Sequence, residues 1–224
     1  MTTGRGTSAT DQPDGFRGRR PTSHEQVSGQ PWDASYHDGP APWEVGHAQA
    51  TIVRLAAEGR FSGAVLDAGC GAGDNTLLIA ERASSVLGID VAETALAMAR
   101  EKAAERGIEA EFTVADALDL QALGRRFDTV VDCGLFHALD ADEQARYATS
   151  LASVTEPGAR AYVLCFSDEG PETGPHPVRR DDLVAAFTTD TGWKIEAIEA
   201  DRIETRFHEH GAPAWLAKVV RTEG

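Results

Sequence analysis

The sequence has little positive charge and few cysteines. Its 36 Asp and Glu residues outnumber the 21 Lys and Arg residues, which gives a formal net charge of −15 at pH 7. Nucleic-acid binding depends on neutralising phosphates with Lys and Arg, so this balance argues against DNA or RNA as a partner and favours a small molecule. Cys70, Cys133 and Cys165 are far apart in the chain and lack the close spacing that metal sites and redox motifs use. We expect three reduced thiols in or near the core.

Long hydrophobic runs are also absent. No segment approaches the roughly 18 uninterrupted apolar residues of a membrane span, and the N-terminus lacks the apolar run of a signal peptide, so we expect a cytoplasmic protein. Residues 1–30 are rich in Gly, Ser, Thr and Gln, and we expect them to form a disordered tail. We expect the rest to be one domain, with an aromatic segment and first helix in residues 31–60 and the main body in residues 61–224.

Apolar runs of strand length alternate with longer helical stretches over most of the chain. "GAVLDAG", "SVLGID", "AEFTVAD", "FDTVVDCGLF" and "RAYVLCFSD" are such runs, and helical patterns separate most of them. This alternation predicts an α/β fold with a mostly parallel sheet that is covered on both faces. No helical pattern separates "WKIEAIEA" from "APAWLAKVV", so these two are predicted to pair antiparallel at one edge. A further helix is predicted in "PWEVGHAQATIVRLAAEG", with Val45 on its apolar side and its end at Gly59.

Acidic residues and glycines mark the predicted strand ends. An aspartate stands at or near four successive ends: Asp67, Asp90, Asp116 and Asp132. Gly69, Gly71 and Gly73 allow the backbone to approach a ligand closely, and Asp90 follows Gly69 by about 20 residues, a spacing that suits hydrogen bonds to ribose hydroxyls. The pattern predicts a ligand that contains a nucleoside. Alternatively, Gly71 or Gly73 serves only helix–strand packing.

The same turn argues against phosphate binding. No Gly-Lys-Ser/Thr follows, and the glycine spacing is shorter than in the dinucleotide fingerprint. The nearby carboxylates of Asp67 and Asp74 suit an ammonium or sulfonium better than a pyrophosphate. An NAD(P)-dependent oxidoreductase remains the alternative that Gly69 and Asp90 alone would support.

Together, "VLDAGCGAG", "GID", "VADAL", "FDTVVDCGLFH" and "PGARAYVLCFSD" resemble the class I S-adenosylmethionine-dependent methyltransferases, from Val65 to roughly the C-terminus. The resemblance implies a Rossmann-like, mostly parallel seven-stranded sheet with helices on both faces and an antiparallel C-terminal edge hairpin. It implies S-adenosylmethionine as cofactor and S-adenosylhomocysteine as product. It also implies a set of cofactor-binding residues: Gly69, Gly71 and Gly73 at the methionine and ribose, Asp67 near the amino group, Asp90 and Val91 at the ribose, Asp116 and Ala117 at the adenine, and Cys133 near the methionine end.

The aromatic segment "PWDASYHDGPAPWEVGHAQA" is similar to a segment of the thiopurine-, halide- and thiol-type methyltransferases and of related actinobacterial small-molecule enzymes. The similarity implies a lid over cofactor and substrate, although Ala48 and Ala50 stand where prolines are common in those relatives. Trp43 is our first candidate to lie against the sulfonium, because a cation is attracted to an aromatic face. Trp32 and Tyr36 are candidate substrate contacts. The alternative is that these aromatics only cover the front of the first helix.

His137 is the candidate catalytic residue, because it follows the fourth predicted strand and is a suitable general base. It could equally brace the loop. Candidate substrate contacts are Phe136 beside it and Phe166, Ser167 and Arg179 around the loop after the fifth strand. Arg179 has a second interpretation, as an ion pair with Asp181 or Asp182. His208 and His210 have no third ligand, so we predict no metal.

The resemblance thus implies an enzyme that methylates O, N or S of a small, fairly apolar molecule, in detoxification or secondary metabolism. A non-catalytic S-adenosylmethionine-binding module is the further alternative. The sequence fixes neither the acceptor atom nor whether the protein is a monomer or a homodimer.

Overall fold

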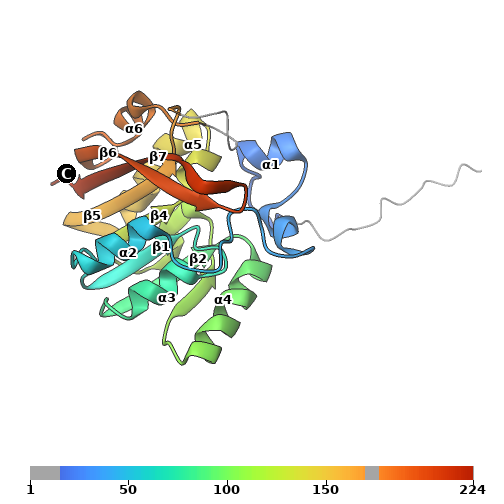
Figure 1. Ribbon diagram of the computed structural model, residues 1–224. Coiled ribbons are helices and arrows are strands. Elements are labelled where there is room, and N and C mark those ends of the chain that lie inside the picture. The colour runs from blue at the N-terminus through green and yellow to red at the C-terminus, as the bar shows by residue number, and fades with distance from the viewer. Residues whose placement is uncertain (1–15, 170–176, 224) are drawn as a thin grey trace, which may run out of the picture.

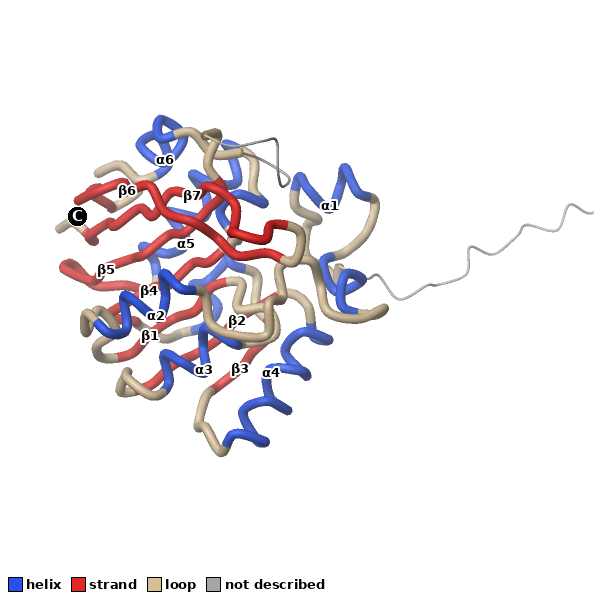
Figure 2. The backbone as a smooth tube through the Cα atoms, viewed as in Figure 1, coloured by secondary structure: helices blue, strands red, loops and turns tan. Residues whose placement is uncertain are grey.

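A computed structural model gives the structure of residues 16–169 and 177–223. Its centre is a seven-stranded sheet in the order β3-β2-β1-β4-β5-β7-β6. The strands are β1 (Ala64–Ala68), β2 (Ser85–Asp90), β3 (Glu111–Val114), β4 (Phe127–Cys133), β5 (Thr155–Phe166), β6 (Trp193–Thr205) and β7 (His208–Arg221). β1 to β5 pair in parallel, and β7 is antiparallel to both β5 and β6 (Figures 1 and 2). The predicted α/β class and the antiparallel C-terminal hairpin are confirmed.

Successive residues of the central strands are buried on opposite faces, which is why these strands read as continuous apolar runs. Leu66 and Val130 pack on the face covered by α5 (Ala141–Ser153) and α6 (Arg180–Ala186), in one large core cluster. Val65 and Val131 pack on the other face, against α2 (Ala50–Ala57) and α3 (Asp74–Ala80). Helix α4 (Glu93–Arg106) joins α3 over β3 in a third cluster. None of the helices in the described ranges is long and apolar enough to cross a membrane.

The order of the strands fixes where a ligand can enter. The chain runs outward from β1 to β2 and β3, and then returns to the other side of β1 with β4 and β5. The loops after β1 and β4 therefore leave in opposite directions and open a crevice at their carboxyl ends, the usual ligand site of such sheets.

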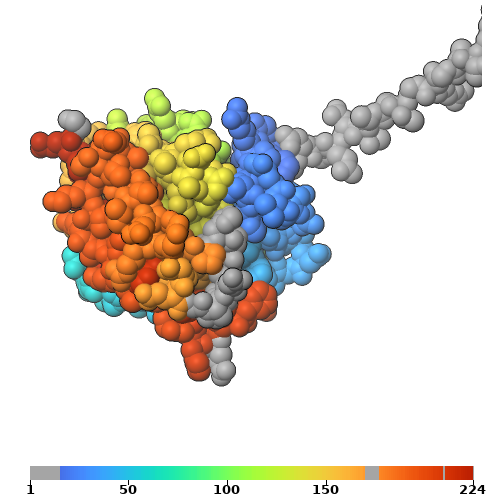
Figure 3. Space-filling view, turned by 90° about the horizontal axis from the view of Figure 1, so that it is seen from above, coloured from blue at the N-terminus to red at the C-terminus, as the bar shows by residue number. Residues whose placement is uncertain are grey.

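The expected disordered tail is wrong for residues 16–30, which are ordered. They contain helix α1 (Ser23–Ser28), whose N-terminus is closed by reciprocal hydrogen bonds between Thr22 and Glu25. Glu25 also pairs with Arg19, and the backbone N–H and hydroxyl of Ser23 donate to Glu143 of α5 at 2.8 and 2.7 Å. Figure 3 shows this blue segment against the yellow α5 region. Residues 1–15 of the expected tail lie outside the described residues.

The chain between α1 and α2 is mostly irregular. A short helix, η1 (Trp32–Tyr36), places Asp33 at the start of α4, where its carboxylate accepts from Thr94 N at 2.7 Å. The predicted first helix begins only at Ala50, because Gly46 has a left-handed φ of +80° that interrupts it, and Val45 lies outside. We call residues 16–49 the lid segment. Two further short helices, η2 (Ala117–Leu123) and η3 (Phe136–Ala138), follow β3 and β4.

Candidate active site

The turn after β1 holds three glycines in the left-handed region, with φ of +71° at Gly69, +53° at Gly71 and +83° at Gly73. Only glycine adopts this conformation without strain. A Cβ at Gly71 would lie 2.6 Å from Glu44 Oε1, whereas one at Gly73 would lie 2.7 Å from the Cβ of Ala99 in α4. Gly71 therefore allows the lid segment to approach the turn, and Gly73 allows helix packing.

Asp90, at the end of β2, ties the glycine turn to the neighbouring strand. Its two carboxylate oxygens accept from Gly71 N and Ala92 N, each at 2.9 Å. Burial raises the pKa of this carboxyl, and the backbone hydrogen bonds oppose that rise. The side chain lines the cavity described below, together with Val91, and the same is true of Asp116 and Ala117 after β3.

Asp67 does not line the cavity. It is 1% exposed, and its Oδ2 accepts from the hydroxyl of Thr76 in α3 at 2.5 Å. Burial raises the pKa of this carboxyl to about 6. Asp67 thus lies beneath the turn, because its strand position directs it toward α3. The structure does not bring it to the position expected for the amino group of a cofactor.

Asp132, at the end of β4, supports the loop that carries His137. Its Oδ1 accepts from Leu135 N at 2.9 Å and from Phe136 N at 3.4 Å, whereas its Oδ2 has no hydrogen-bond partner among the described residues. The side chain is completely buried beside Tyr147, and burial raises its pKa to about 7. Through these two hydrogen bonds, the Asp132 carboxyl holds the backbone of the loop at Leu135 and Phe136.

Trp32, Tyr36 and Trp43 of the lid segment form one cluster. Trp43 Nε1 donates to the hydroxyl of Tyr36 at 2.8 Å, and the Trp43 ring meets those of Trp32 and Tyr36 edge-on, with centroids 5.6 and 6.1 Å apart. Trp32 stacks on His24 of α1 at 4.6 Å. All four line the cavity, so they do more than cover the front of α2.

His137 stacks on Phe166 with ring centroids 4.3 Å apart, and its Nδ1 accepts from the backbone N–H of Phe166 at 3.2 Å. A nitrogen that accepts a hydrogen bond carries no proton, so the neutral imidazole holds its proton on Nε2. The β5 backbone therefore sets both the orientation and the tautomer of this ring.

The tip of the β6–β7 hairpin, residues 203–208, forms another wall. The side-chain amide of Gln49 in the lid segment bonds both backbone groups of Glu204, donating to its carbonyl at 2.9 Å and accepting from its N–H at 2.7 Å. Arg206 N donates to the carbonyl of Pro42 at 2.9 Å. These bonds hold the hairpin tip against the lid segment, and Phe207 stays 76% exposed at the cavity rim.

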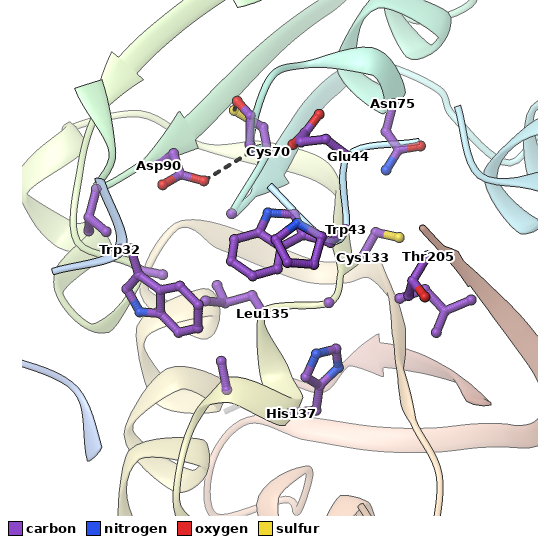
Figure 4. A pocket seen from close by; sticks show the side chains of 18 of the residues that line it. Trp32, Trp43, Glu44, Cys70, Asn75, Asp90, Cys133, Leu135, His137 and Thr205 are labelled. Carbon is purple, nitrogen blue, oxygen red and sulfur yellow. Dashed lines mark hydrogen bonds between the residues drawn. The ribbon is translucent and has the colours of Figure 1, made fainter. Parts of the chain in front are cut away.

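These elements enclose one cavity of about 350 Å³. In Figure 4, Asp90, Glu44 and Asn75 line its upper part and His137 its lower part. Twelve predicted site residues line it: Trp32, Tyr36, Trp43, Gly69, Gly71, Asp90, Val91, Asp116, Ala117, Cys133, His137 and Phe166. Five do not: Asp67, Gly73, Phe136, Ser167 and Arg179.

Three of the predicted site residues that do not line the cavity have other roles in the structure. Phe136 is completely buried and packs against Tyr147 and Phe187. Ser167 is 5% exposed, and its hydroxyl accepts from Glu169 N. Arg179 pairs with Asp182 at the start of α6, so its second interpretation is confirmed. The middle of that loop, residues 170–176, lies outside the described residues.

The sequence analysis missed several lining residues. Glu44 follows Trp43 in the aromatic segment, where the resemblance points only to the aromatic side chains. Gln49 lies inside the predicted first helix and Asn75 inside the helix that follows the glycine turn, and no local pattern marks either as a cavity residue. The hairpin tip joins the cavity only through its bonds to the lid segment, so no sequence signal identifies Thr205 or Phe207.

The charges of the cavity fit a nucleoside with a cationic end. Among the described lining residues, the carboxylates include Glu44, Asp90 and Asp116, whereas Arg19 is the one Arg or Lys and is paired with Glu25. A pyrophosphate needs cations or an open set of N–H donors, which this lining does not offer. Within the same described ranges, no three His, Cys, Asp or Glu side chains are grouped to hold a metal ion.

The family model described as "Methyltransferase domain" matches residues 65–158. Over 192 residues, the chain is 36% identical to the 2-heptyl-1-hydroxyquinolin-4(1H)-one methyltransferase of Mycobacteroides abscessus, covering 84% of this chain and 78% of that protein.

Two solved structures share the fold. One, titled "Conversion of a Disulfide Bond into a Thioacetal Group during Echinomycin Biosynthesis", has a TM-score of 0.73 and 36% identity and covers 81% of this chain and 84% of the other. The other is magnesium protoporphyrin IX methyltransferase from Synechocystis PCC 6803 with bound SAM, at a TM-score of 0.60 and 25% identity, with 77% of each chain covered.

Proposed function

Because this chain belongs to the class I S-adenosylmethionine-dependent methyltransferases, we propose that it methylates a ring-borne hydroxyl of a small, flat, largely apolar molecule. Its membership makes it a small-molecule methyltransferase that uses S-adenosylmethionine. The proposal adds the chemistry of the acceptor.

One observation carries the proposal: the stack of His137 on Phe166, two residues that both line the cavity. Leu135, Ile203 and Phe207 are further apolar residues of the cavity lining. Aromatic and aliphatic side chains arranged in this way favour a flat ring, since stacked and edge-on contacts add to the gain from burial. The Mycobacteroides abscessus relative is named for such an acceptor, a quinolinone that carries a ring hydroxyl and a heptyl chain.

The tautomer of His137 changes the role that we propose for it. With Nδ1 accepting from Phe166, the ring presents an N–H at Nε2, which is a donor and not a base. We infer that His137 donates to the acceptor oxygen and favours its ionised form. Such an acceptor enters with its proton already lost, so an acidic ring hydroxyl is a better substrate than an aliphatic alcohol.

The main task of the protein is then to align the acceptor oxygen with the methyl group of the cofactor. Bound S-adenosylmethionine supplies a methyl group on a sulfonium, which is a good leaving group without further activation. The glycine turn and Asp90 fix the cofactor side, while His137 and the hairpin tip fix the acceptor side. Orientation of this kind contributes on the order of 7–11 kcal/mol to a two-reactant step. The lid segment excludes water from the cleft.

The deciding experiment measures S-adenosylhomocysteine release with a panel of 1-hydroxyquinolin-4-ones, phenols, aromatic thiols and ring N–H heterocycles. We expect the hydroxylated rings to be turned over fastest, with kcat/KM rising as the hydroxyl becomes more acidic. Faster turnover of thiols or ring nitrogens would overturn the proposed acceptor atom. His137→Ala should lower kcat/KM for hydroxyl acceptors, whereas His137→Asn should retain part of it because the amide is also a donor.

Phe207 tests the apolar character of the substrate. Its ring is exposed at the rim, where a substituent of the acceptor would leave the cavity. We expect Phe207→Ala to reduce kcat/KM for heptyl-substituted rings by roughly tenfold, the equivalent of losing one or two buried CH₂ contacts, and to leave the methyl-substituted analogue unchanged. Val184→Ala truncates an exposed side chain of α6 and is the matched control. Equal losses for both ring types would contradict this placement.

We also propose that the protein works in the cytoplasm. Its three cysteines are unpaired, which suits a reducing compartment. The net charge of −15 supports a small molecule and not a nucleic acid as partner.

A further inference from the structure

Glu44 belongs to the lid segment, yet its carboxylate reaches the glycine turn. Its Oε1 accepts from the backbone N–H of Ala72 at 3.1 Å and occupies the space where a Cβ of Gly71 would lie. Trp43, the preceding residue, bonds Tyr36, whose hydroxyl also reaches Gly71. The carboxylate is thus placed at the turn by both backbone and side-chain contacts.

No described Lys, Arg or His lies within ion-pair distance of Glu44. The nearby Asp74 pairs with both Lys102 and Arg106, whereas the nearby Asp90 bonds only backbone N–H groups. Burial raises the pKa of Glu44, as do the charges of Asp74 and Asp90, although the Ala72 bond and Lys102 oppose this. A partly buried carboxylate without a counter-ion is costly, so this end of the cavity is arranged for a positive charge.

We propose that Glu44 is the counter-ion of the α-ammonium group in the methionine part of the cofactor, so that the lid segment itself carries one of the cofactor's ligands. Asp67, which the sequence suggested for this group, is buried beneath the turn and bonded to Thr76. The inference rests on the cofactor alone and is independent of the acceptor proposed above.

A consequence is that cofactor binding and lid closure are linked. If the ammonium bonds Glu44, each cofactor molecule bound also holds the chain between Tyr36 and Gln49 on the turn. A ligand that has the adenosine but no amino acid group loses this effect. The two tryptophans of the lid segment report on it, because Trp193 and Trp215 are buried in the core and stay unchanged.

The test compares S-adenosylhomocysteine with 5′-methylthioadenosine, which keeps the adenosine and thioether but lacks the amino acid group. Glu44→Gln removes the charge and retains an oxygen that can accept from Ala72. We expect it to weaken S-adenosylhomocysteine binding by roughly ten- to hundredfold in calorimetry, since hydrogen bonds to charged groups are among the stronger ones. Binding of 5′-methylthioadenosine should change by less than about twofold, which also shows that the variant is folded.

Glu58→Gln, which removes a carboxylate at the far end of α2, is the control and should leave both affinities unchanged. If Glu44→Gln weakens the binding of both ligands equally, Glu44 only holds the lid segment on the glycine turn. If it weakens the binding of neither, Glu44 faces no positive charge of the cofactor. Both results overturn the proposal.

A second readout is acrylamide quenching of tryptophan fluorescence. In the wild type, S-adenosylhomocysteine should protect the lid tryptophans more than 5′-methylthioadenosine does, and in Glu44→Gln the two ligands should protect equally. If S-adenosylhomocysteine still protects the lid tryptophans more than 5′-methylthioadenosine does in Glu44→Gln, lid closure does not depend on Glu44, and the proposed linkage is contradicted.

Discussion

At the scale of single residues, Gly71 lies directly against the carboxylate of Glu44. Replacing it with alanine places a Cβ on the Glu44 carboxylate, and the least costly relief is for the Glu44 side chain to leave the turn. Gly124 is a matched control, because its φ of +61° is similar and a Cβ there meets nothing within 4 Å.

We expect Gly71→Ala and Gly124→Ala each to lower the free energy of unfolding by about 1–2 kcal/mol, the cost of a side chain in the left-handed region. Only Gly71→Ala should also weaken S-adenosylhomocysteine binding, by at least about tenfold. Urea denaturation and calorimetry check the two effects separately. Unaltered affinity in Gly71→Ala would mean that Glu44 can move away without consequence for the cofactor.

Asp132 predicts a dependence of stability on pH. Its pKa is about 7 in the folded protein against 3.8 ordinarily, so it favours folding when protonated. This contribution is complete below about pH 4 and is lost as the pH rises through 7. Asp132→Asn keeps an oxygen for Leu135 N and Phe136 N but cannot ionise.

We therefore expect the unfolding free energy of Asp132→Asn, relative to the wild type, to increase between pH 5 and pH 8. Urea denaturation at both pH values measures this difference. Asp67, whose pKa is also raised by burial, titrates in both proteins and largely cancels from the comparison. A difference that is the same at both pH values would contradict the assignment.

Residue-level patterns predicted the backbone of the site better than its side-chain directions. Gly69, Gly71, Asp90 and Asp116 line the cavity, and their placement is predictable because turn conformation and strand ends follow from local sequence. Asp67 is the counterexample: it lies on a strand end like Asp90, but its side chain points to α3 and Thr76. The two residues share one face of the sheet, but Asp67 stands one residue before the end of β1 whereas Asp90 is the last residue of β2, and the sequence does not state such strand ends to the residue.

At the scale of elements, the lid segment stabilises the helix that it covers. Helix α4 has Ala92 at its N-cap position, with no side-chain bond, and Asp33 of the lid segment bonds the N–H and hydroxyl of Thr94 instead. An exposed aspartate of the same segment, Asp38, provides a control.

Asp33→Ala should lower the unfolding free energy by about 1 kcal/mol, as the loss of a helix cap does, and the melting temperature by about 2–4 °C. Asp38→Ala should leave both unchanged. Differential scanning calorimetry provides the measurement, and equal behaviour of the two variants would show that Asp33 does not cap α4.

The central elements were predictable because their strands are buried on both faces and read as apolar runs. Helix α1 was not, since its position depends on Ser23 bonding Glu143, which is 120 residues away. The start of α2 was placed too early because Val45 continues an apolar pattern that the left-handed Gly46 breaks. Long-range contacts and single backbone dihedrals are the information that local patterns lack.

At the scale of the whole molecule, cofactor binding should stabilise the fold. A ligand that binds only the folded state adds about 2.7 kcal/mol at a hundredfold excess over its Kd, or roughly 5–10 °C in the melting temperature for a chain of this size. We expect this shift with S-adenosylmethionine and S-adenosylhomocysteine and none with NADH in a thermal-shift titration. A shift with NADH alone would contradict the cofactor assignment.

The two hydrogen bonds between the Gln49 side chain and the Glu204 backbone also bear on how the acceptor preference can be altered. Gln49 bonds the backbone of Glu204, not its side chain, so these bonds require a backbone N–H at residue 204 but no particular side chain there. Within the tip, the Thr205 hydroxyl bonds His208 Nδ1 and accepts from Phe207 N, so we expect residues 205–208 to be exchangeable as one unit, which would change the acceptor preference and leave the residues around the glycine turn in place.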